Sequence, residues 1–470
     1  MKGILPRPTL SFYLSETKKV TRGAKKSSLF LCGYCYFFIA WMCNATIDFA
    51  MAKIIQAVKG TQDYYPHEMA LRSWLYAKMR EASESFGYQE YDGPFLERFD
   101  LYAAKSGAEL VEKQSYVFED RGGEKITLRP ELTPTLARMV AARQRQLSFP
   151  LRWWSFGPFW RYERPQKGRT REFFQWNIDL IGENSPEADA ELAAIAATFL
   201  KSVGLQASET QVLVNNRQVM QAEIEQLGIS ASKRAAIFAL IDRRDKMSAD
   251  AWSKYGADMG LDATQLMGIE ALIENQDLWK KSDNLQRFFK AIEAFGVQDY
   301  VRFAPQVIRG LDYYTGTVFE AWDTAGEFRA IFGGGRYDDL VNAVGGDPVP
   351  AVGFAVGNVV VGLLLETFGR TPKLTAATDV FVTLFNEEFL DETIRLATEL
   401  RAAGLKVTIQ LSAEKLPKQF KQADRLGVKS VLVLGPDEIK GNSVTVKDLA
   451  SGEQKAIPRQ KVTAWLSTPA

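Results

Sequence analysis

Apolar residues recur at helical spacing in several stretches of the chain, the first of which spans residues 68–86. Five apolar positions lie three or four residues apart there, and Gly87 follows as a helix-ending residue. A strand is predicted next, over residues 89–95. Two further short strands, 116–118 and 125–129, flank an Arg-Gly-Gly turn. The pattern therefore predicts an amphipathic helix, a strand and a small hairpin, in this order.

A larger hairpin is predicted from two runs of aromatic and β-branched residues. Residues 153–162 and 172–181 have the composition and length of strands, and residues 164–171 between them contain proline and glycine. We expect the two strands to pair antiparallel and to bring Arg161 and Gln175 to neighbouring positions. The chain from Phe159 to Phe174 would then hold several cations over one polyanion, or it would be a solvated basic hairpin.

Two helices with proline in the first turn are predicted around this hairpin. Thr133 and Pro134 form a good N-cap and first-turn pair for a helix over residues 134–146, which accounts for Thr133 as a capping residue. A second helix opens in the same way at Ser185 and ends near Gly204. Residues 216–299 are mostly helical in pattern and contain no recognisable catalytic motif.

The C-terminal part of the chain alternates predicted strands with predicted helices. The strands are 380–385, 406–411 and 428–434, and the helices are 388–402 and 413–426. Such a βαβαβ order implies a parallel sheet with right-handed crossovers, and thus a separate α/β domain over residues 376–470. The second helix carries four basic residues, which form either a solvated face or a phosphate-contacting surface: Lys415, Lys418, Lys421 and Arg425.

Composition limits the chemistry that the chain can perform. A length of 470 residues is enough for two to four domains, because a single core stops growing at about 250–300 residues. The net charge of +1 argues against a surface coated in positive charge. All three cysteines lie within the first 43 residues, and His67 is the only histidine. No disulfide, no metal site and no Ser-His-Asp triad are therefore predicted beyond residue 43, as expected for a cytoplasmic protein.

The first 50 residues differ from the rest. The apolar run 29–43 follows two lysines and resembles the core of a signal peptide, but it is shorter than the approximately 20 residues of a membrane-spanning helix. One interpretation is a targeting or membrane segment. The change in sequence character at Met51 favours the other, a start codon assigned too early.

Charged residues also occur inside an apolar, aromatic stretch, residues 307–316. Arg309 and Asp312 are expensive to bury in such a strand without partners. A structural ion pair between them is one explanation, and a role in binding substrate is the other.

Several of these stretches resemble one protein family. Residues 161–164 (RYER) and the loop after them resemble motif 2 of the class II aminoacyl-tRNA synthetases, and residues 163–169 (ERPQKGR) resemble the histidyl-tRNA synthetases in particular. Residues 309–316 (RGLDYYTG) and 332–338 (FGGGRYD) resemble the two signature stretches of that family, and residues 51–66 resemble its usual start. The resemblance extends from Met51 to the C-terminus.

This resemblance implies a homodimer whose class II catalytic domain, residues 51–370, has an antiparallel sheet flanked by helices. The predicted helix 68–86 and the strand after it would form motif 1 at the dimer interface. Residues of about 216–299 would be an inserted helical domain that approaches the tRNA acceptor stem. Residues 376–470 would be the anticodon-binding domain.

The same resemblance implies a reaction and roles in it. ATP and L-histidine would give histidyl-adenylate, and the histidyl group would then pass to the tRNA for histidine. Arg161 and Arg309 would hold the α-phosphate and the amino-acid carboxylate from opposite sides. Arg169 would hold the γ-phosphate, with Mg²⁺ bridging phosphate oxygens, and Glu163 would face the adenine.

Histidine itself would be recognised by two groups of side chains. Three residues would bind its amino group: Glu131, Thr133 and Gln175. Three would recognise its imidazole: Asp179, Tyr314 and Tyr313. A carboxylate and a phenol can satisfy the two ring nitrogens of an imidazole.

One position departs from the family pattern. Motif 3 of the class carries an arginine early in a helix, where it stacks on the adenine, whereas this chain has Val360 near that place. The nucleotide must then be held in another way. The departure also leaves an alternative open, a non-catalytic paralogue that acts as a regulatory subunit of ATP phosphoribosyltransferase. Such a paralogue lacks an anticodon-binding domain and usually the histidine-specific stretches, both of which are predicted here.

Overall fold

The structure is a computed structural model that describes residues 54–103, 114–164, 170–309, 313–374 and 377–467. The apolar run 29–43, Arg169 and Asp312 lie outside the described residues. Within those residues, no helix combines the length and the apolar character needed to cross a membrane.

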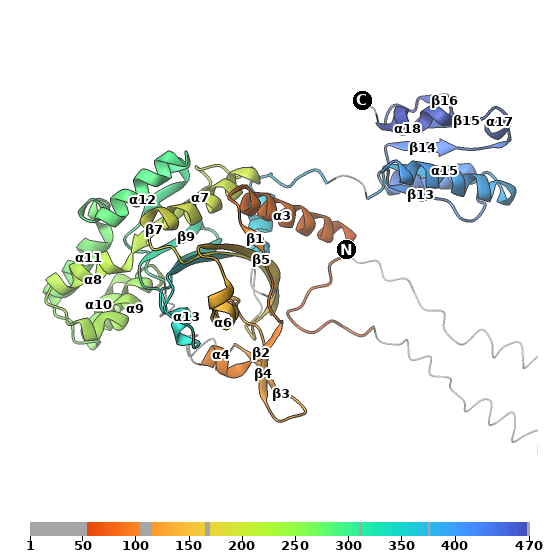
Figure 1. Cartoon of the computed structure of the whole chain (residues 1–470). Coiled ribbons are helices and arrows are strands. Elements are labelled where there is room, and N and C mark those ends of the chain that lie inside the picture. Colours follow the sequence, from red (N-terminus) through yellow and green to blue (C-terminus); the bar gives the residue numbers. More distant parts are fainter. Residues whose placement is uncertain (1–53, 104–113, 165–169, 310–312, 375–376, 468–470) are drawn as a thin grey trace, which may run out of the picture. The chain divides into compact units, whose positions relative to one another are not determined.

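An eight-stranded sheet forms the larger part of the fold (Figure 1), in the order β1-β5-β6-β11-β10-β9-β7-β8. The six strands from β5 to β7 in this order pair antiparallel, which confirms the predicted antiparallel sheet. Only the two outer pairs, β1 with β5 and β7 with β8, are parallel. The strands are β1 (Gln89–Glu90), β5 (Leu151–Trp160), β6 (Glu172–Ile181), β7 (Thr210–Asn216), β8 (Val301–Phe303), β9 (Thr317–Asp323), β10 (Phe332–Arg336) and β11 (Ala351–Gly357).

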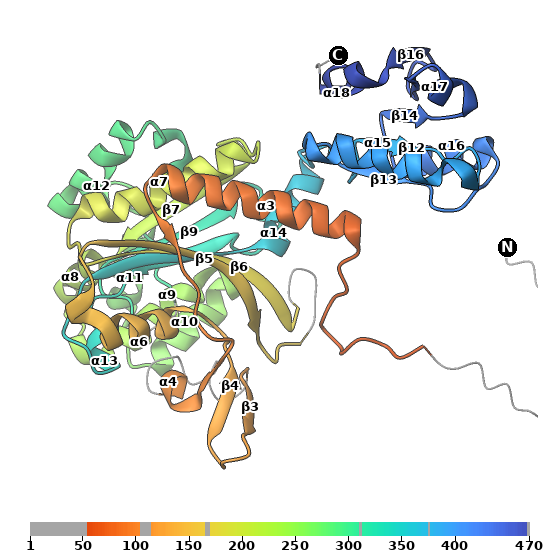
Figure 2. The same ribbon diagram turned by 45° about the vertical axis from the view of Figure 1, so that its right-hand side comes forward.

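Helices cover both faces of this sheet. Figures 1 and 2 show α3 (Pro66–Ser85) and α7 (Pro186–Ser202) side by side on one face, and α6 (Thr133–Arg143) on the other. The main core lies under α3 and α7 and includes the fully buried Trp154 and Trp176. A smaller cluster, which includes Leu136 of α6, fills the space under that helix. As predicted, α7 opens with Ser185, whose side chain accepts a hydrogen bond from the Ala188 N–H.

The predicted strand over residues 89–95 is wrong in its extent. Only Gln89 and Glu90 pair in the main sheet, and the next strand, β2 (Leu96–Arg98), belongs to a separate three-stranded sheet. The chain turns between them because the Asp92 carboxylate accepts a hydrogen bond from the Gly93 N–H and an ion pair from Arg129. Local carboxylate-to-backbone bonds of this kind compete with strand pairing.

The small hairpin is confirmed, with β3 (Tyr116–Glu119) and β4 (Lys125–Leu128) completing the three-stranded sheet in the order β2-β4-β3. Figures 1 and 2 show it projecting from the sheet and helices. The short helix α4 (Phe99–Ala103) follows β2.

Residues between β7 and β8 are mostly helical, as expected. The helices are α8 (Arg217–Gln226), α9 (Arg234–Asp242), α10 (Ala249–Asp258), α11 (Ala263–Glu274) and α12 (Asp283–Ala294). The last of them, α12, is joined to α7 by an ion pair of 2.6 Å between Arg287 and Glu187. Two further helices follow in the chain, α13 (Leu340–Ala343) and α14 (Asn358–Thr367).

The C-terminal residues form a second sheet with its own core. Its five strands run in the order β13-β12-β14-β15-β16, and the first three pair parallel as predicted. The prediction did not include the two antiparallel strands that extend this sheet. The strands are β12 (Val380–Val382), β13 (Val407–Ile409), β14 (Ser430–Val433), β15 (Ser443–Asp448) and β16 (Gln454–Pro458), and the helices are α15 (Leu390–Ala402), α16 (Leu416–Arg425), α17 (Pro436–Lys440) and α18 (Arg459–Ser467).

Candidate active site

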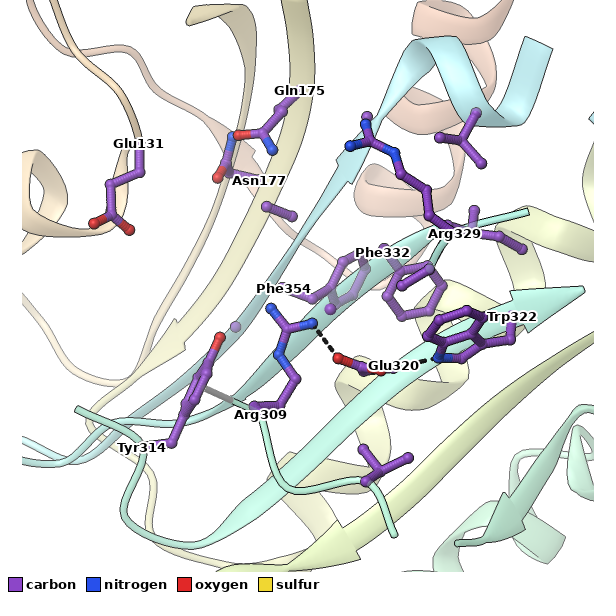
Figure 3. Close-up of a pocket in the computed structure, with 18 of the residues that line it drawn as sticks. Glu131, Gln175, Asn177, Arg309, Tyr314, Glu320, Trp322, Arg329, Phe332 and Phe354 are labelled. Atoms are coloured by element: carbon purple, nitrogen blue, oxygen red, sulfur yellow. Dashed lines mark hydrogen bonds and ion pairs between the residues drawn. The ribbon is translucent and has the colours of Figure 1, made fainter. Parts of the chain in front are cut away.

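A cavity of about 1000 Å³ is lined by residues of β6, β9, β10 and β11, the start of α6 and the chain around Arg309. It collects predicted site residues that are up to 183 positions apart in the sequence, from Glu131 to Tyr314. Nine predicted residues line it: Glu131, Thr133, Arg161, Glu163, Gln175, Asp179, Arg309, Tyr313 and Tyr314. The tenth, Arg169, lies outside the described residues. Figure 3 shows how several of these side chains converge on one space.

Strand β6 supplies three polar residues to the cavity because side chains alternate along a strand. Gln175, Asn177 and Asp179 line the cavity, while Trp176 and Ile178 between them point into the main core. Asn177 did not stand out in the sequence. It is 4% exposed, and its Nδ2 has no hydrogen-bond partner in the described structure. An orphaned buried donor of this kind suits a polar ligand.

The Arg161 side chain is held in place from two sides. Its Nε donates a hydrogen bond of 2.9 Å to the Pro130 carbonyl, and its guanidinium lies 5.2 Å from the centre of the Phe173 ring. The hairpin is confirmed, but the expected pairing of Arg161 with Gln175 is wrong. Gln175 pairs with Gly157, and the Arg161 N–H bonds to the Arg171 carbonyl. Both side chains nevertheless line the cavity.

Thr133 is not the N-cap of α6, contrary to prediction. The helix begins at Thr133 itself, and Leu132 occupies the capping position without a side-chain cap. Thr133 therefore lines the cavity without a capping bond from its own helix. The neighbouring Glu131 is 7% exposed, and its Oε2 accepts a hydrogen bond of 3.3 Å from the Tyr313 hydroxyl.

Asp179 lies at the closed end of the polar row on β6. Burial raises the pKa of its carboxyl to about 7, against the opposing effect of the hydrogen bond donated by the Tyr337 hydroxyl. Its neighbour across the sheet is Gly353. A Cβ on Gly353 would lie 2.0 Å from Asp179 Oδ1, so the carboxyl occupies space that only a glycine leaves open. Tyr337 is therefore a positioning residue that the sequence did not reveal.

Arg309 lies in irregular chain, not in the strand expected over residues 307–316. Its φ is 59°, a left-handed conformation that non-glycine residues rarely adopt. Its Nη1 makes a 2.6 Å ion pair with Glu320 on β9, whose other oxygen accepts a hydrogen bond from Trp322 (Figure 3). Burial by itself lowers the pKa of Arg309, but Tyr314 and Glu320 outweigh that effect and raise it. The guanidinium thus stays charged.

The glycines of the FGGGR stretch make room for other parts of the site. A Cβ on Gly333 would lie 1.9 Å from Arg309 Nη1. A Cβ on Gly334 would meet the Gly353 carbonyl at 2.3 Å, and one on Gly335 would meet the Thr317 carbonyl at 2.7 Å. These residues form strand β10, so this glycine-rich stretch allows close approach and is not a phosphate-binding loop.

Arg217, the first residue of α8, holds the chain around Arg309. Its guanidinium donates hydrogen bonds to three carbonyls: Ile308 (3.1 Å), Arg309 (2.7 Å) and Tyr314 (2.7 Å). The side chain is 8% exposed. Its three acceptors lie on the two sides of residues 310–312, which are outside the described residues. No motif in the sequence pointed to this arginine.

The described residues contain no cluster of three or more histidine, cysteine, aspartate or glutamate side chains that could hold a metal ion. Val360 is 2% exposed and belongs to the main core, although it also borders the cavity. It therefore supplies packing where the class carries an arginine.

The antiparallel sheet, the arginine-bearing hairpin β5-β6 and the polar cavity beside them define a class II aminoacyl-tRNA synthetase. A family profile described as "Histidyl-tRNA synthetase" matches residues 60–359, and one described as "Anticodon binding domain" matches residues 379–468. The chain belongs to the histidyl-tRNA synthetase family.

Known relatives cover nearly the whole chain. A protein of Haloarcula marismortui named histidine–tRNA ligase is 38% identical over 86% of this chain and 95% of its own length. A protein of Arabidopsis thaliana named histidine–tRNA ligase, chloroplastic/mitochondrial, is 37% identical over 87% of this chain and 86% of its own length. The crystal structure of histidyl-tRNA synthetase from Nostoc sp. PCC 7120 has the same fold, with a TM-score of 0.76 at 24% identity, covering 88% of this chain and 98% of that one.

Proposed function

We propose that this protein is a histidine–tRNA ligase that activates histidine with ATP and transfers it to its tRNA. The observation that carries this proposal is the convergence of residues from three separate motifs in one cavity. The regulatory-subunit alternative is not better supported, since the relatives are named as ligases and the anticodon-binding profile matches the C-terminal residues.

Histidine would bind at the β6 end of the cavity. Glu131, Thr133 and Gln175 would receive its ammonium group, because a carboxylate and neutral oxygens suit a cation in a partly dry site. Asp179 and Tyr314, with Tyr313 beside them, would receive the imidazole. The orientation of Asp179 by Tyr337 supports this assignment, because a held carboxylate recognises a ring N–H at a fixed position.

ATP would enter as its Mg²⁺ complex, so that the metal ion is part of the substrate. Arg161 and Arg309 come from different elements and would hold the α-phosphate between them, with the histidine carboxylate beside it. Glu163 would face the adenine, and Arg169 would reach the γ-phosphate. The histidine carboxylate displaces pyrophosphate in line, and the two guanidinium groups stabilise the charge that develops on the α-phosphate oxygens.

The tRNA would contact two further parts of the chain. We assign the helices α8 to α12 to the acceptor stem, as a domain inserted into the catalytic domain of residues 51–370. Residues 376–470 would bind the anticodon. The attachment of α8 to the cavity through Arg217 supports a connection between the inserted helices and histidine activation.

We also propose that the protein is a homodimer. Four apolar side chains on or next to the small sheet are 41–49% exposed in the single chain: Phe95, Leu96, Val117 and Phe118. Large exposed apolar side chains are frequent at interfaces. The apolar face of α3, by contrast, is buried within its own chain. Sedimentation of the double variant V117D/F118D should give the monomer mass, and an unchanged dimer mass would contradict this surface.

We place the protein in the cytoplasm. The absence of cysteine after residue 43 supports a reducing compartment.

Histidine-dependent exchange of pyrophosphate into ATP tests the catalytic proposal directly. The parent protein should catalyse it, and ATP binding without exchange would favour the regulatory reading. Arg309→Ala should lower the exchange rate by about 10²–10³-fold while the thermal unfolding curve stays that of a folded protein. Arg302→Ala removes an exposed arginine outside the cavity and serves as the control. Near-normal exchange by a folded Arg309→Ala protein would refute the role of Arg309.

A further inference from the structure

The start of α14 offers no cation to the cavity. Its residues Val359 and Val360 border the space, and both are apolar. Val360 is packed in the main core, so its position cannot be adapted to a charged side chain without disturbing that packing. A positive charge at this end of the cavity must therefore come from another element.

The chain between β9 and β10 brings an arginine to the same place. Arg329 lines the cavity together with Asn358, Val359 and Val360 of α14. In the view of Figure 3, its long side chain extends from the chain before β10, and the rings of Phe332 and Phe354 lie between it and Arg309. Arg329 thus faces a different part of the cavity from the Arg309–Glu320 pair.

This connection is held in a defined shape although Arg329 itself is exposed. The carboxylate of Asp323, which is 3% exposed, accepts hydrogen bonds from the Glu327 N–H (2.8 Å) and the Phe328 N–H (3.1 Å). Phe328 packs against the main core, and the Ile331 N–H bonds to the Ala321 carbonyl at 2.7 Å. The backbone on both sides of Arg329 is therefore fixed.

Four basic residues line the described cavity: Arg161, Lys246, Arg309 and Arg329. Arg309 is already neutralised by Glu320 at 2.6 Å, and Lys246 forms an ion pair of 2.7 Å with Asp242. Glu131, Glu163 and Asp179 add carboxyl groups to the lining. A triphosphate in this setting needs further positive charge to offset its own, and a guanidinium can hold two phosphate oxygens at once.

We propose that Arg329 binds the terminal phosphates of ATP and supplies the cation that α14 lacks at Val360. This inference rests on the proposed function, in which Arg161 and Arg309 hold the α-phosphate. Arg329 is then a nucleotide-binding residue at the β- and γ-phosphates, reached from the β9–β10 connection instead of from a helix. The terminal phosphates are then held by a residue that is distant in sequence from α14.

The test compares the two substrates and AMP in the pyrophosphate-exchange assay. Arg329→Ala should raise the KM for ATP about tenfold or more, equal to at least ~1.4 kcal/mol of binding. The KM for histidine should change less than about twofold, and so should the inhibition constant of AMP, which has no terminal phosphates. The KM for ATP of Arg329→Lys should fall between those of the parent and the alanine variant, because lysine keeps the charge but lacks the planar guanidinium that can hold two phosphate oxygens.

Three results would overturn the proposal. They are an unchanged KM for ATP, an equal rise of the AMP inhibition constant, and an equal rise of the KM for histidine. The matched control is Arg302→Ala, which removes an exposed arginine from β8 outside the cavity and should leave all three constants at the parent values. A loss in the control equal to that of Arg329→Ala would assign the effect to overall charge and would also refute the proposal. Absence of exchange in the parent protein would instead refute the proposed function.

Discussion

Single glycines decide where the arginine of the RGLDYYTG stretch can lie. Gly333 leaves the space that the Arg309 guanidinium crosses, and Gly353 leaves the space that Asp179 occupies. The sequence shows a run of three glycines in residues 332–338, but a run of glycines alone does not distinguish a phosphate-binding loop from a close-packed strand. Pairing of β10 with β9 and β11 makes that distinction.

Gly333→Ala tests this directly. The added methyl group would occupy the place of Arg309 Nη1, so the guanidinium must shift from the position in which it pairs with Glu320. We expect pyrophosphate exchange to fall by about 10²-fold or more, with an unfolding midpoint close to the parent's. Gly362→Ala is the control, because no atom lies within 4 Å of its added Cβ and it lies on α14. A fully active Gly333→Ala protein would contradict the argument.

The pKa of Asp179 predicts how histidine binding depends on pH. Because burial raises this pKa to about 7, the carboxyl loses its charge as the pH falls below 7. We expect the KM for histidine to rise over that range. Asp179→Asn should have a KM for histidine raised about 10- to 100-fold and should keep only the pH dependence of the substrate's own imidazole. An identical pH profile in parent and variant would exclude Asp179 from imidazole recognition.

The raised pKa of Asp179 also makes the free energy of unfolding depend on pH. The pKa of Asp179 is higher in the folded than in the unfolded chain, so folding favours the protonated carboxyl. The stabilisation is complete below the unfolded value of 3.8 and is lost as the pH rises through about 7. The difference in unfolding free energy between parent and Asp179→Asn should therefore change across this window.

At the level of elements, hydrogen bonds hold α8 and the chain around Arg309 together. The Arg217 side chain binds three carbonyls of that chain, and the Arg217 N–H bonds to the Gly316 carbonyl at 2.9 Å. Because α8 is the first of the inserted helices, a movement of these helices would change the position of Arg309. The sequence predicted the helices but could not predict this attachment, which joins residues about 90 positions apart.

Arg217→Lys should separate positioning from folding. A lysine keeps the charge but cannot donate to three carbonyls in a plane, so the chain carrying Arg309 should become less ordered. We expect the kcat of pyrophosphate exchange to fall about tenfold or more. The free energy of unfolding should fall by about 1–3 kcal/mol, because buried carbonyls lose their donors. Ala222→Lys at an exposed position of α8 adds a lysine without touching those carbonyls and controls for the change of residue type. A normal kcat would contradict the positioning role.

On the scale of the whole molecule, the proposed reaction would divide between two sheets with separate cores. Histidine activation would take place at the cavity of the eight-stranded sheet, and recognition of the tRNA would involve the five-stranded one. Helix α16 turns Gln419 and Ala423 inward and leaves Lys421 and Arg425 exposed. Those basic side chains are available to phosphates.

The double variant K421A/R425A should weaken tRNA binding and spare the adenylation step. We expect the KM for tRNA to rise several-fold and the salt dependence of binding to fall by about one unit of slope for each lost phosphate contact. Pyrophosphate exchange should be unchanged. The control K440A removes an exposed lysine from α17. An unchanged KM for tRNA would mean that the basic residues of α16 form a solvated face and do not bind tRNA.

The sequence by itself determined most of the elements and the residue types of the site. The aromatic and β-branched residues of 172–181 predicted a strand, and the Arg-Tyr-Glu-Arg and RGLDYYTG stretches contain five of the nine predicted residues that line the cavity. It failed for Thr133, where the helix begins one residue earlier than predicted, and for the strand over residues 89–95, where the Asp92 carboxylate bonds to the Gly93 N–H. The tertiary structure alone decided the partners Glu320, Tyr337 and Arg217 and the approach of Arg329 to α14. These depend on which strands pair, and contacts between distant residues leave no periodic signal in a single sequence.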